Sequence, residues 1–249
     1  MIIDTHTHLD NKKFLDDVDE VIKRAEDAGV KKFIIPAADP ADLPRAIELA
    51  QKYDNVYFAV GFHPVDINKY DEKLITCFIN HPKCVAVGEI GLDYYWVKDK
   101  EQREKQIEYF HKQIELAKKY NKPIIVHIRE ATEDSVNVIE SHPEIKGVFH
   151  CFNAAEQLLK FSDRFYYGIG GVITFKNAKK LVNVFPKIPK NRVVIETDAP
   201  YLTPHPYRGK RNEPMYTTLI RDKIAELWNL SKEDVEEITT ENARRLFKI

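Results

Sequence analysis

Residues 1–10 read MIIDTHTHLD, and this stretch decides between the two fold classes that the rest of the sequence allows. Met1–Asp4 is a short apolar run of the kind that forms a buried parallel strand. A doubly wound open sheet usually carries a glycine-rich phosphate loop directly after its first strand. Here the strand runs instead into Thr-His-Thr-His, and no GxGxxG motif occurs anywhere in the chain. The stretch therefore favours a barrel over an open sheet.

Seven further strand-like runs follow, and segments with helical spacing of apolar residues separate them. The expected strands are Met1–Asp4, Lys32–Pro36, Val56–Gly61, Cys84–Gly88, Pro123–His127, Gly147–His150, Phe165–Ile169 and Val193–Glu196. The expected helical stripes are Leu15, Val18, Ile22 and Ala25; Leu43, Ile47 and Ala50; Ile107, Phe110, Ile114 and Ala117; and Tyr216, Ile220, Ile224 and Leu227. Eight strand–helix units in about 250 residues match the typical size of a (β/α)8 barrel. We therefore predict one TIM-like α/β barrel domain that spans residues 1–249.

The composition excludes several classes of protein. The chain has 38 basic and 39 acidic side chains, and this balance excludes a broadly basic coat for nucleic acid. No apolar run approaches the ~18 residues of a membrane span, and the first residues lack the features of a secretory signal. Cys77, Cys84 and Cys151 are an odd number without a CxxC pair, which is typical of a reducing compartment. We therefore expect a cytoplasmic protein, with no membrane and no obligate protein partner.

Residue types that bind metals or transfer protons follow the predicted strands. The catalytic groups of a (β/α)8 barrel lie at the C-terminal ends of its strands. His6 and His8 are two residues apart in extended backbone, so both imidazoles point to the same side. Four more strands end in Glu89, His127, His150 and Asp198. A single histidine at a strand end is usually a core residue with satisfied hydrogen bonds, but five strands with such residues at one rim indicate a metal centre.

The number of these ligands indicates two metal ions. Four imidazoles and two carboxylates are too many for one tetrahedral zinc ion. They suit two divalent cations about 3.5–4 Å apart that share one carboxylate. Such a pair lowers the pKa of a bound water and polarises a carbonyl or phosphoryl oxygen. Histidine-rich ligation favours Zn, Mn, Ni or Fe over Mg, although nucleases often use Mg. The sequence therefore predicts two divalent cations and leaves their identity, Zn, Mn, Mg or Ni, open.

A series of motifs extends over nearly the whole chain. They are THTHLD, GFHP, GEIGLDYYW, IVHIRE, FHCF, ETDAPYLTP and RGKRNEP, in this order. With them the chain resembles the TatD-type metal-dependent deoxyribonucleases of the amidohydrolase superfamily. The resemblance implies a TIM-like barrel, dependence on divalent metals and hydrolysis of phosphodiester bonds in DNA, as an exonuclease that works from strand ends.

The resemblance also implies roles for single residues. It makes His6, His8 and Asp198 ligands of the first cation, Glu89 the bridging carboxylate, and His127 and His150 ligands of the second cation. Asp198 is the expected general base, because it can bind a metal and still accept the proton of the attacking water; the alternative is a purely structural ligand. Many relatives in the superfamily bridge their metals with a carboxylated lysine. Here the motif supplies Glu89, so we expect no such modification.

Two departures from the family pattern concern the substrate rather than the metals. Val65 stands in GFHPVD where the family often has a second histidine, and Asn153 and Ala154 stand in HCFNAA where it often has Ser-Gly. Neither change removes a predicted ligand. His63 is therefore a candidate for binding substrate or for supporting a metal ligand, and the alternative is an ordinary loop histidine before Pro64.

Basic side chains near the strand ends are candidates for binding phosphate. Arg129 lies two residues beyond His127, and Arg208, Lys210 and Arg211 form a basic loop after Asp198. The arginine fork matches phosphate oxygens. The alternative for this loop is exposure to solvent or an ion pair with Glu213.

Aromatic side chains also follow Glu89. Tyr94, Tyr95 and Trp96 could stack on unpaired bases, or they could pack under neighbouring loops. Together with the basic residues they favour single-stranded DNA ends as the substrate over an intact duplex.

Three hypotheses for function remain open from the sequence. The first is a two-metal deoxyribonuclease, in which Asp198 and Glu89 are the catalytic carboxylates. The second is an amidohydrolase that acts on a small ester or amide, or a deacylase of aminoacyl-tRNA, because the same metal centre could attack a carbonyl group. The third is a metal-binding protein without catalytic activity, which six costly polar groups at one rim disfavour.

Overall fold

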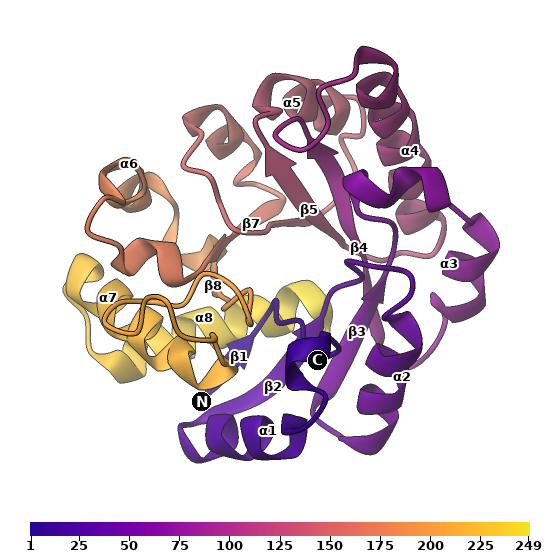
Figure 1. Cartoon of the computed structure of the whole chain (residues 1–249). Coiled ribbons are helices and arrows are strands. Elements are labelled where there is room, and N and C mark those ends of the chain that lie inside the picture. The colour runs from indigo at the N-terminus through magenta and orange to yellow at the C-terminus, as the bar shows by residue number, and fades with distance from the viewer.

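The computed structural model describes residues 1–249 and confirms the predicted single (β/α)8 barrel (Figure 1). Eight parallel strands follow one another around the barrel in sequence order. The strands are β1 (Ile2–Asp4), β2 (Val30–Ile35), β3 (Val56–Val60), β4 (Cys84–Asp93), β5 (Ile124–Arg129), β6 (Gly147–Phe149), β7 (Phe165–Ile169) and β8 (Val193–Ile195). All eight expected strands are therefore present.

Helices surround the strands on the outside, as Figure 1 shows. They are α1 (Val18–Asp27), α2 (Leu43–Lys52), α3 (Glu72–Phe78), α4 (Lys100–Lys119), α5 (Thr132–Glu140), α6 (Lys179–Val184), α7 (Thr217–Trp228) and α8 (Lys232–Phe247). Short 3-10 helices occupy Lys12–Phe14, Pro64–Lys69, Glu156–Phe161, Gly171–Thr174, Phe185–Lys187, Lys190–Arg192 and Pro214–Tyr216. No helix combines the length and the apolar character that a membrane crossing requires.

The barrel closes between its first and last strands. The backbone N–H of Thr5 donates to the carbonyl oxygen of Ile195 over 3.0 Å, and Thr7 forms an isolated parallel bridge with Ala199. Both contacts lie at or beyond the C-terminal ends of β1 and β8. The closure therefore brings the segment that carries His6 and His8 next to the segment that carries Asp198.

The inside of the barrel is filled at its N-terminal end. A buried apolar cluster takes at least one residue from each strand and adds Ala243, Leu246 and Phe247 from α8. On α8, Thr240 donates to the carbonyl oxygen of Met1, and Asn242 donates to that of Val193, so this helix covers the starts of β1 and β8. Because α8 covers this end, polar side chains that enter the barrel gather at the opposite, C-terminal end.

Three local expectations were wrong. Strand β4 continues to Asp93, five residues beyond the expected end, because its second half pairs with β5 as far as Arg129. Leu15 does not belong to the first helical stripe, since α1 begins at Val18 and Leu15 is 53% exposed. Tyr216 precedes α7 and is not part of it.

Candidate metal centre

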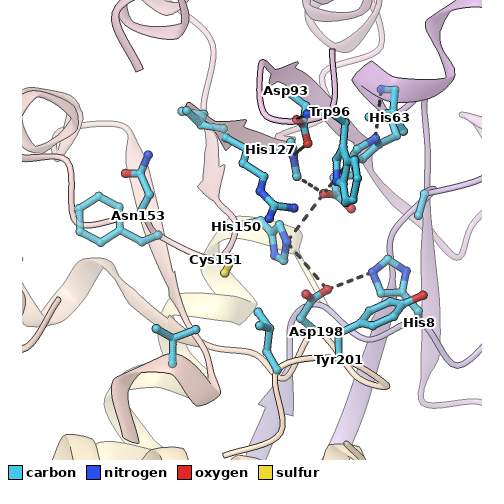
Figure 2. A pocket seen from close by; sticks show the side chains of 18 of the residues that line it. His8, His63, Asp93, Trp96, His127, His150, Cys151, Asn153, Asp198 and Tyr201 are labelled. Carbon is cyan, nitrogen blue, oxygen red and sulfur yellow. Dashed lines mark hydrogen bonds and ion pairs between the residues drawn. The ribbon is translucent and has the colours of Figure 1, made fainter. Parts of the chain in front are cut away.

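The predicted ligands line one cavity at the C-terminal end of the barrel. The cavity has a volume of about 1130 Å³, and the ends of the five strands that carry the expected ligands, β1, β4, β5, β6 and β8, converge on it. Figure 2 shows His8, His127, His150 and Asp198 around it. This volume lies slightly above the usual range of about 300–1,000 Å³ for small-molecule sites. Its lining includes His8, His63, Glu89, Asp93, Trp96, His127, Arg129, His150 and Asp198. His6 lies beneath them and is 1% exposed.

The carboxylate of Asp4 ties the ends of β1 and β8 together. It accepts hydrogen bonds from the backbone N–H of Thr197 (3.0 Å), the hydroxyl of Thr197 (2.6 Å) and the backbone N–H of His6 (3.3 Å). The backbone N–H of Asp198 donates in turn to the carbonyl oxygen of His6, 2.9 Å away. Asp198 has a left-handed φ of 58°, a conformation that costs energy for a residue other than glycine. These bonds therefore fix the positions of His6 and Asp198 relative to each other.

Four donors converge on the first candidate cation position. The Nε2 atom of His6 lies 3.4 Å from Oε2 of Glu89 and 3.6 Å from Oδ1 of Asp198. The Nε2 atom of His8 lies 3.1 Å from the same Oδ1 atom. His6, His8 and Glu89 place ligand atoms within 4.8 Å of one another. The structure thus brings together the residues expected around the first cation.

Glu89 also faces the second candidate cation position. Its Oε1 atom lies 2.7 Å from Nδ1 of His127 and 3.7 Å from Nε2 of His150. These three residues again place ligand atoms within 4.8 Å of one another. The imidazole of His150 stacks on that of His6 with 3.4 Å between the ring centroids, so the two candidate positions are adjacent. Glu89 reaches both with different oxygens, as a bridging carboxylate requires.

Two carboxylates that the sequence analysis did not single out hold these histidines from behind. Oδ2 of Asp93 is hydrogen-bonded to Nε2 of His127 at 2.9 Å. Oε1 of Glu196 lies 3.1 Å from Nδ1 of His150, within ion-pair distance but without the geometry of a hydrogen bond. Both side chains are 1% exposed. A carboxylate behind a metal-binding histidine fixes its tautomer and orientation. The sequence held one signal that could have identified them. Asp93 lies four residues after Glu89, and Glu196 lies two residues before Asp198. Residues an even number of positions apart in extended backbone point to the same face.

The charges around Glu89 and Asp198 favour the ionised forms of these two carboxylates. Burial alone would raise the pKa of Glu89, but the imidazoles of His150, His6 and His63 outweigh it and hold this pKa well below its ordinary value. Burial would also raise the pKa of Asp198. The hydrogen bond from His8 and the charge of His150 outweigh burial, so the pKa of Asp198 is lowered. Both carboxylates are therefore charged at neutral pH and available as metal ligands.

The imidazoles divide into two groups. Burial lowers the pKa of His6, with a contribution from His150, and it lowers the pKa of His63 to about 3. Burial also opposes the charged form of His150, but the carboxylates of Glu196 and Glu89 prevail and raise its pKa to about 10. The bond to Asp198 similarly overcomes burial and raises the pKa of His8. Burial also opposes the charged form of His127, but the hydrogen bonds to Asp93 and Glu89 prevail and raise its pKa. A divalent cation must therefore compete with protons on His8, His127 and His150.

An observation independent of charge also fits a metal. Both ring nitrogens of His6 are buried and lack a hydrogen-bond partner. A buried polar atom without a partner is costly, and the great majority of such atoms in proteins are satisfied. A cation bound through Nε2 of His6 would satisfy the nitrogen that faces Glu89 and Asp198. The donor set of imidazoles and carboxylates is one that divalent cations bind.

Two of the predicted substrate residues line the cavity. His63 accepts a hydrogen bond from the backbone N–H of Val65 through Nδ1, and its Nε2 atom lies 3.5 Å from Oε1 of Glu89. Arg129 extends from the end of β5 and is exposed. The departures from the family pattern, Val65, Asn153 and Ala154, also line the cavity. They therefore lie where a substrate would contact them.

Tyr94 does not line the cavity. It is buried, and its hydroxyl donates to Oδ2 of Asp134 over 2.6 Å, while the guanidinium of Arg103 covers its ring. Its neighbour Trp96 is instead 66% exposed and lines the cavity. The aromatic candidate that the structure places at the cavity is therefore Trp96 and not Tyr94.

The basic loop does not line the cavity either. Arg208 donates to the carbonyl oxygen of Thr203 and lies 3.9 Å from the ring centroid of Phe175. Lys210 lies 5.5 Å from the ring centroid of Tyr207. Arg208 and Lys210 thus pack against the neighbouring rings of Phe175 and Tyr207, outside the cavity.

Arg211 is engaged in ion pairs. It forms a two-pronged pair with Asp17 (2.8 and 2.6 Å) and contacts Glu213 at 2.9 Å. The carboxylates hold the guanidinium of Arg211, so its fork is not available to a phosphate. The ion pair with Glu213, the alternative expected from the sequence, is the arrangement that the structure has.

Comparisons with known proteins agree with this geometry. A family model described as "TatD related DNase" matches residues 3–248. The chain is 45% identical to "Uncharacterized metal-dependent hydrolase YabD" of Bacillus subtilis over 100% of both chains. It is similar in structure to YjjV, a TatD homologue from Escherichia coli, with a TM-score of 0.92, 32% identity and coverage of 100% and 98% of the two chains. A TatD family hydrolase from Entamoeba histolytica matches with a TM-score of 0.86 and 26% identity, over 99% of this chain and 97% of that one.

Proposed function

We propose that this chain, which belongs to the TatD-related DNase family of metal-dependent hydrolases, hydrolyses phosphodiester bonds at single-stranded DNA ends. The observation that carries the proposal is the position of Glu89. Its two oxygens face two adjacent sets of nitrogen ligands at the bottom of one open cavity. Two divalent cations held in this way suit the displacement of one phosphate ester oxygen by water.

The proposed ligand sets follow from the distances. His6, His8 and Asp198 would hold one cation, His127 and His150 the other, and Glu89 would bridge them. The cations would be Zn, Mn, Ni or Mg; imidazole ligands favour the transition metals over Mg. When bound, the cations supply a water of lowered pKa and polarise the phosphoryl oxygen.

The side chains supply proton transfer and orientation. Asp198 is the proposed general base, because Oδ1 lies at the edge of the cavity, 3.1 Å from His8, and its carboxylate is ionised. Asp93 and Glu196 would keep the nitrogens of His127 and His150 turned toward the cations. His63, beside Glu89 on the cavity wall, would contact the substrate.

The charges at the mouth support an anionic substrate. Lys12, Arg129 and Lys180 line the cavity, and none of their side chains forms an ion pair or a hydrogen bond within the chain. Of the acids that also line the mouth, Asp39 is paired with Lys69, and Asp10 and Asp42 have no ion pair with a lysine or arginine. Three cationic groups without partners suit the phosphates of a strand, whereas a neutral amide or ester has no need of them.

The proposal is tested with purified protein that has been stripped and then reloaded with Zn, Mn, Ni or Mg. The reloaded protein is expected to release nucleotides from a single-stranded oligonucleotide with a labelled end. Asp198→Asn is expected to reduce the rate by a factor of about 100 to 10,000, as for loss of a general base. The matched control is Asp16→Asn, because Asp16 is exposed and has no ion pair.

Other substrates decide between the remaining hypotheses. An enzyme that leaves DNA intact but hydrolyses small esters, amides or aminoacyl-tRNA would replace the nuclease with an amidohydrolase or deacylase. A protein that binds metal and hydrolyses none of these compounds would contradict a catalytic role altogether.

A further inference from the structure

Trp96 is the most exposed large apolar side chain of the protein. It is 66% exposed, and it lies at the wall of the cavity that contains the proposed metal ligands (Figure 2). Burying a side chain of this size is favourable by roughly 2–3 kcal/mol of free energy, and Trp96 forgoes most of this while it is exposed to water. Isolated exposed residues are common, but an exposed indole beside an active-site cavity suits contact with a ligand.

The backbone beneath this ring is held in place. One carboxylate oxygen of Asp93 accepts hydrogen bonds from the backbone N–H groups of Tyr95 (3.0 Å) and Trp96 (2.9 Å). The other oxygen of Asp93 contacts His127, at 2.9 Å. The same carboxylate therefore positions a proposed metal ligand and the start of the loop that carries the indole. The backbone at Trp96 is thus held by the same carboxylate that contacts His127.

Arg129 lies against the same pair of rings. Its guanidinium carbon is 3.9 Å from the ring centroid of Tyr95 and 5.7 Å from that of Trp96, and the two rings meet edge to face. No carboxylate lies within ion-pair distance of Arg129, and its side chain donates no hydrogen bond within the chain. A guanidinium held by its face on an aromatic ring keeps its N–H edges free for an acceptor.

We propose that Trp96 and Arg129 form a binding subsite for one nucleotide next to the cleaved bond, with the indole stacked on an unpaired base and the guanidinium on a neighbouring phosphate. The proposal rests on the proposed function, which places a phosphodiester at the cations. Stacking requires an exposed base face, so the subsite selects single-stranded ends over paired DNA. It does not depend on the identity of the base, because every base has such a face.

The two tryptophans of the chain make the subsite directly measurable. Trp228 is 9% exposed and stacks on Phe185, 5.5 Å between ring centroids, so a ligand in the cavity does not reach it. The probe is a single-stranded thymidine octamer with phosphorothioate linkages, which resist hydrolysis during titration of the metal-loaded protein. We expect the octamer to quench the emission of Trp96. Trp96→Phe, which leaves Trp228 alone, is expected to show no quenching while it retains most of the affinity.

Affinity separates the two halves of the subsite. Trp96→Ala is expected to weaken binding of the octamer about tenfold, and this ratio is expected to fall toward one when the octamer carries abasic residues. Arg129→Met is expected to reduce the slope of log affinity against log salt by about 0.7, the contribution of one phosphate on a single strand. The matched controls are Tyr207→Ala, an exposed tyrosine outside the cavity, and Arg245→Met on α8.

Failure of the subsite and failure of the proposed function give different results. If wild-type protein cleaves natural oligonucleotides while Trp96→Ala binds and cleaves them equally well, the subsite is refuted and the nuclease remains. If wild-type protein neither binds nor cleaves DNA, both proposals fail. A change of oligomeric state in Trp96→Ala, with unchanged DNA affinity, would assign the indole to a protein contact and also refute the subsite.

Discussion

The Nε2 atom of His127 lies 2.9 Å from Oδ2 of Asp93, while the Nδ1 atom of the same ring lies 2.7 Å from Oε1 of Glu89. Asp93 and Glu89 stand at opposite nitrogens of one imidazole, although both belong to β4. If Nε2 carries the proton and donates it to Asp93, Nδ1 presents a lone pair to the proposed cation. Asp93 would therefore position His127 for the proposed second cation.

Asp93→Asn is expected to weaken binding at the second cation position about 10–100-fold. An asparagine amide can donate to Nε2, which would move the proton of His127 to Nδ1 and block the lone pair. Competition with a chelator of known affinity measures the effect, and circular dichroism checks the fold. Asp66→Asn on the nearby 3-10 helix is the control, and equal metal affinity in Asp93→Asn and wild type would contradict the assignment.

Removal of the metals is expected to lower the melting temperature. Carboxylates and imidazoles from five strands or strand ends meet at the centre, and a cation that binds only the folded state stabilises it by mass action. At a hundredfold excess over the dissociation constant this amounts to about 2.7 kcal/mol for each cation, or roughly 5–10 °C for a chain of this size. Calorimetry with and without a chelator measures the shift, and a double His6→Ala and His127→Ala variant should show almost none.

The basic loop is expected to contribute little to activity. Arg208 and Lys210 pack against Phe175 and Tyr207 outside the cavity. Replacing both with alanine should therefore leave kcat/KM on single-stranded DNA within about twofold, because lost long-range attraction between exposed charges is screened by salt. Steady-state kinetics at 0.15 M salt tests this expectation. A loss of tenfold or more in kcat/KM would indicate that this loop contacts the substrate.

Glu236 is expected to make stability depend on pH. Burial opposes its charged form, but hydrogen bonds from the N-terminal ammonium and Arg221 prevail and lower its pKa below the ordinary 4.5. A lowered pKa stabilises the folded state above the unfolded value, and this contribution disappears as pH falls through the folded value. Glu236→Gln should therefore cost about 1 kcal/mol at pH 7 and much less at pH 3. Urea unfolding at both pH values measures the difference, with the unpaired, exposed Glu237→Gln as control.

Several features were predictable from the sequence because they depend on local order. The apolar runs of the eight strands reflect burial on both faces, so their number and sequence positions could be read directly. The barrel rule then places the residue after each run at a common rim. The convergence of His6, Glu89 and Asp198 follows from these two steps. In the structure Nε2 of His6 lies 3.4 Å from Oε2 of Glu89 and 3.6 Å from Oδ1 of Asp198.

Other features could not be predicted because they depend on where side chains point. Arg129 and Arg211 are equally basic in the sequence, yet one faces the cavity and the other is bound by Asp17 and Glu213. Tyr94 and Trp96 are two residues apart, yet one is buried against α5 and the other is exposed at the cavity.

The sequence by itself determined the barrel and the residue types at its rim, because the pattern of buried residues and the order of the strands can be read from neighbouring positions. Only the tertiary structure decided that Glu89 faces both sets of imidazoles and that Asp93 and Glu196 lie behind His127 and His150. It also decided which lysine and arginine side chains have no ion pair. These relations join residues tens of positions apart in the chain. Their distances are fixed by the closure of the barrel and by the direction of each side chain, and neither is encoded by spacing along the sequence.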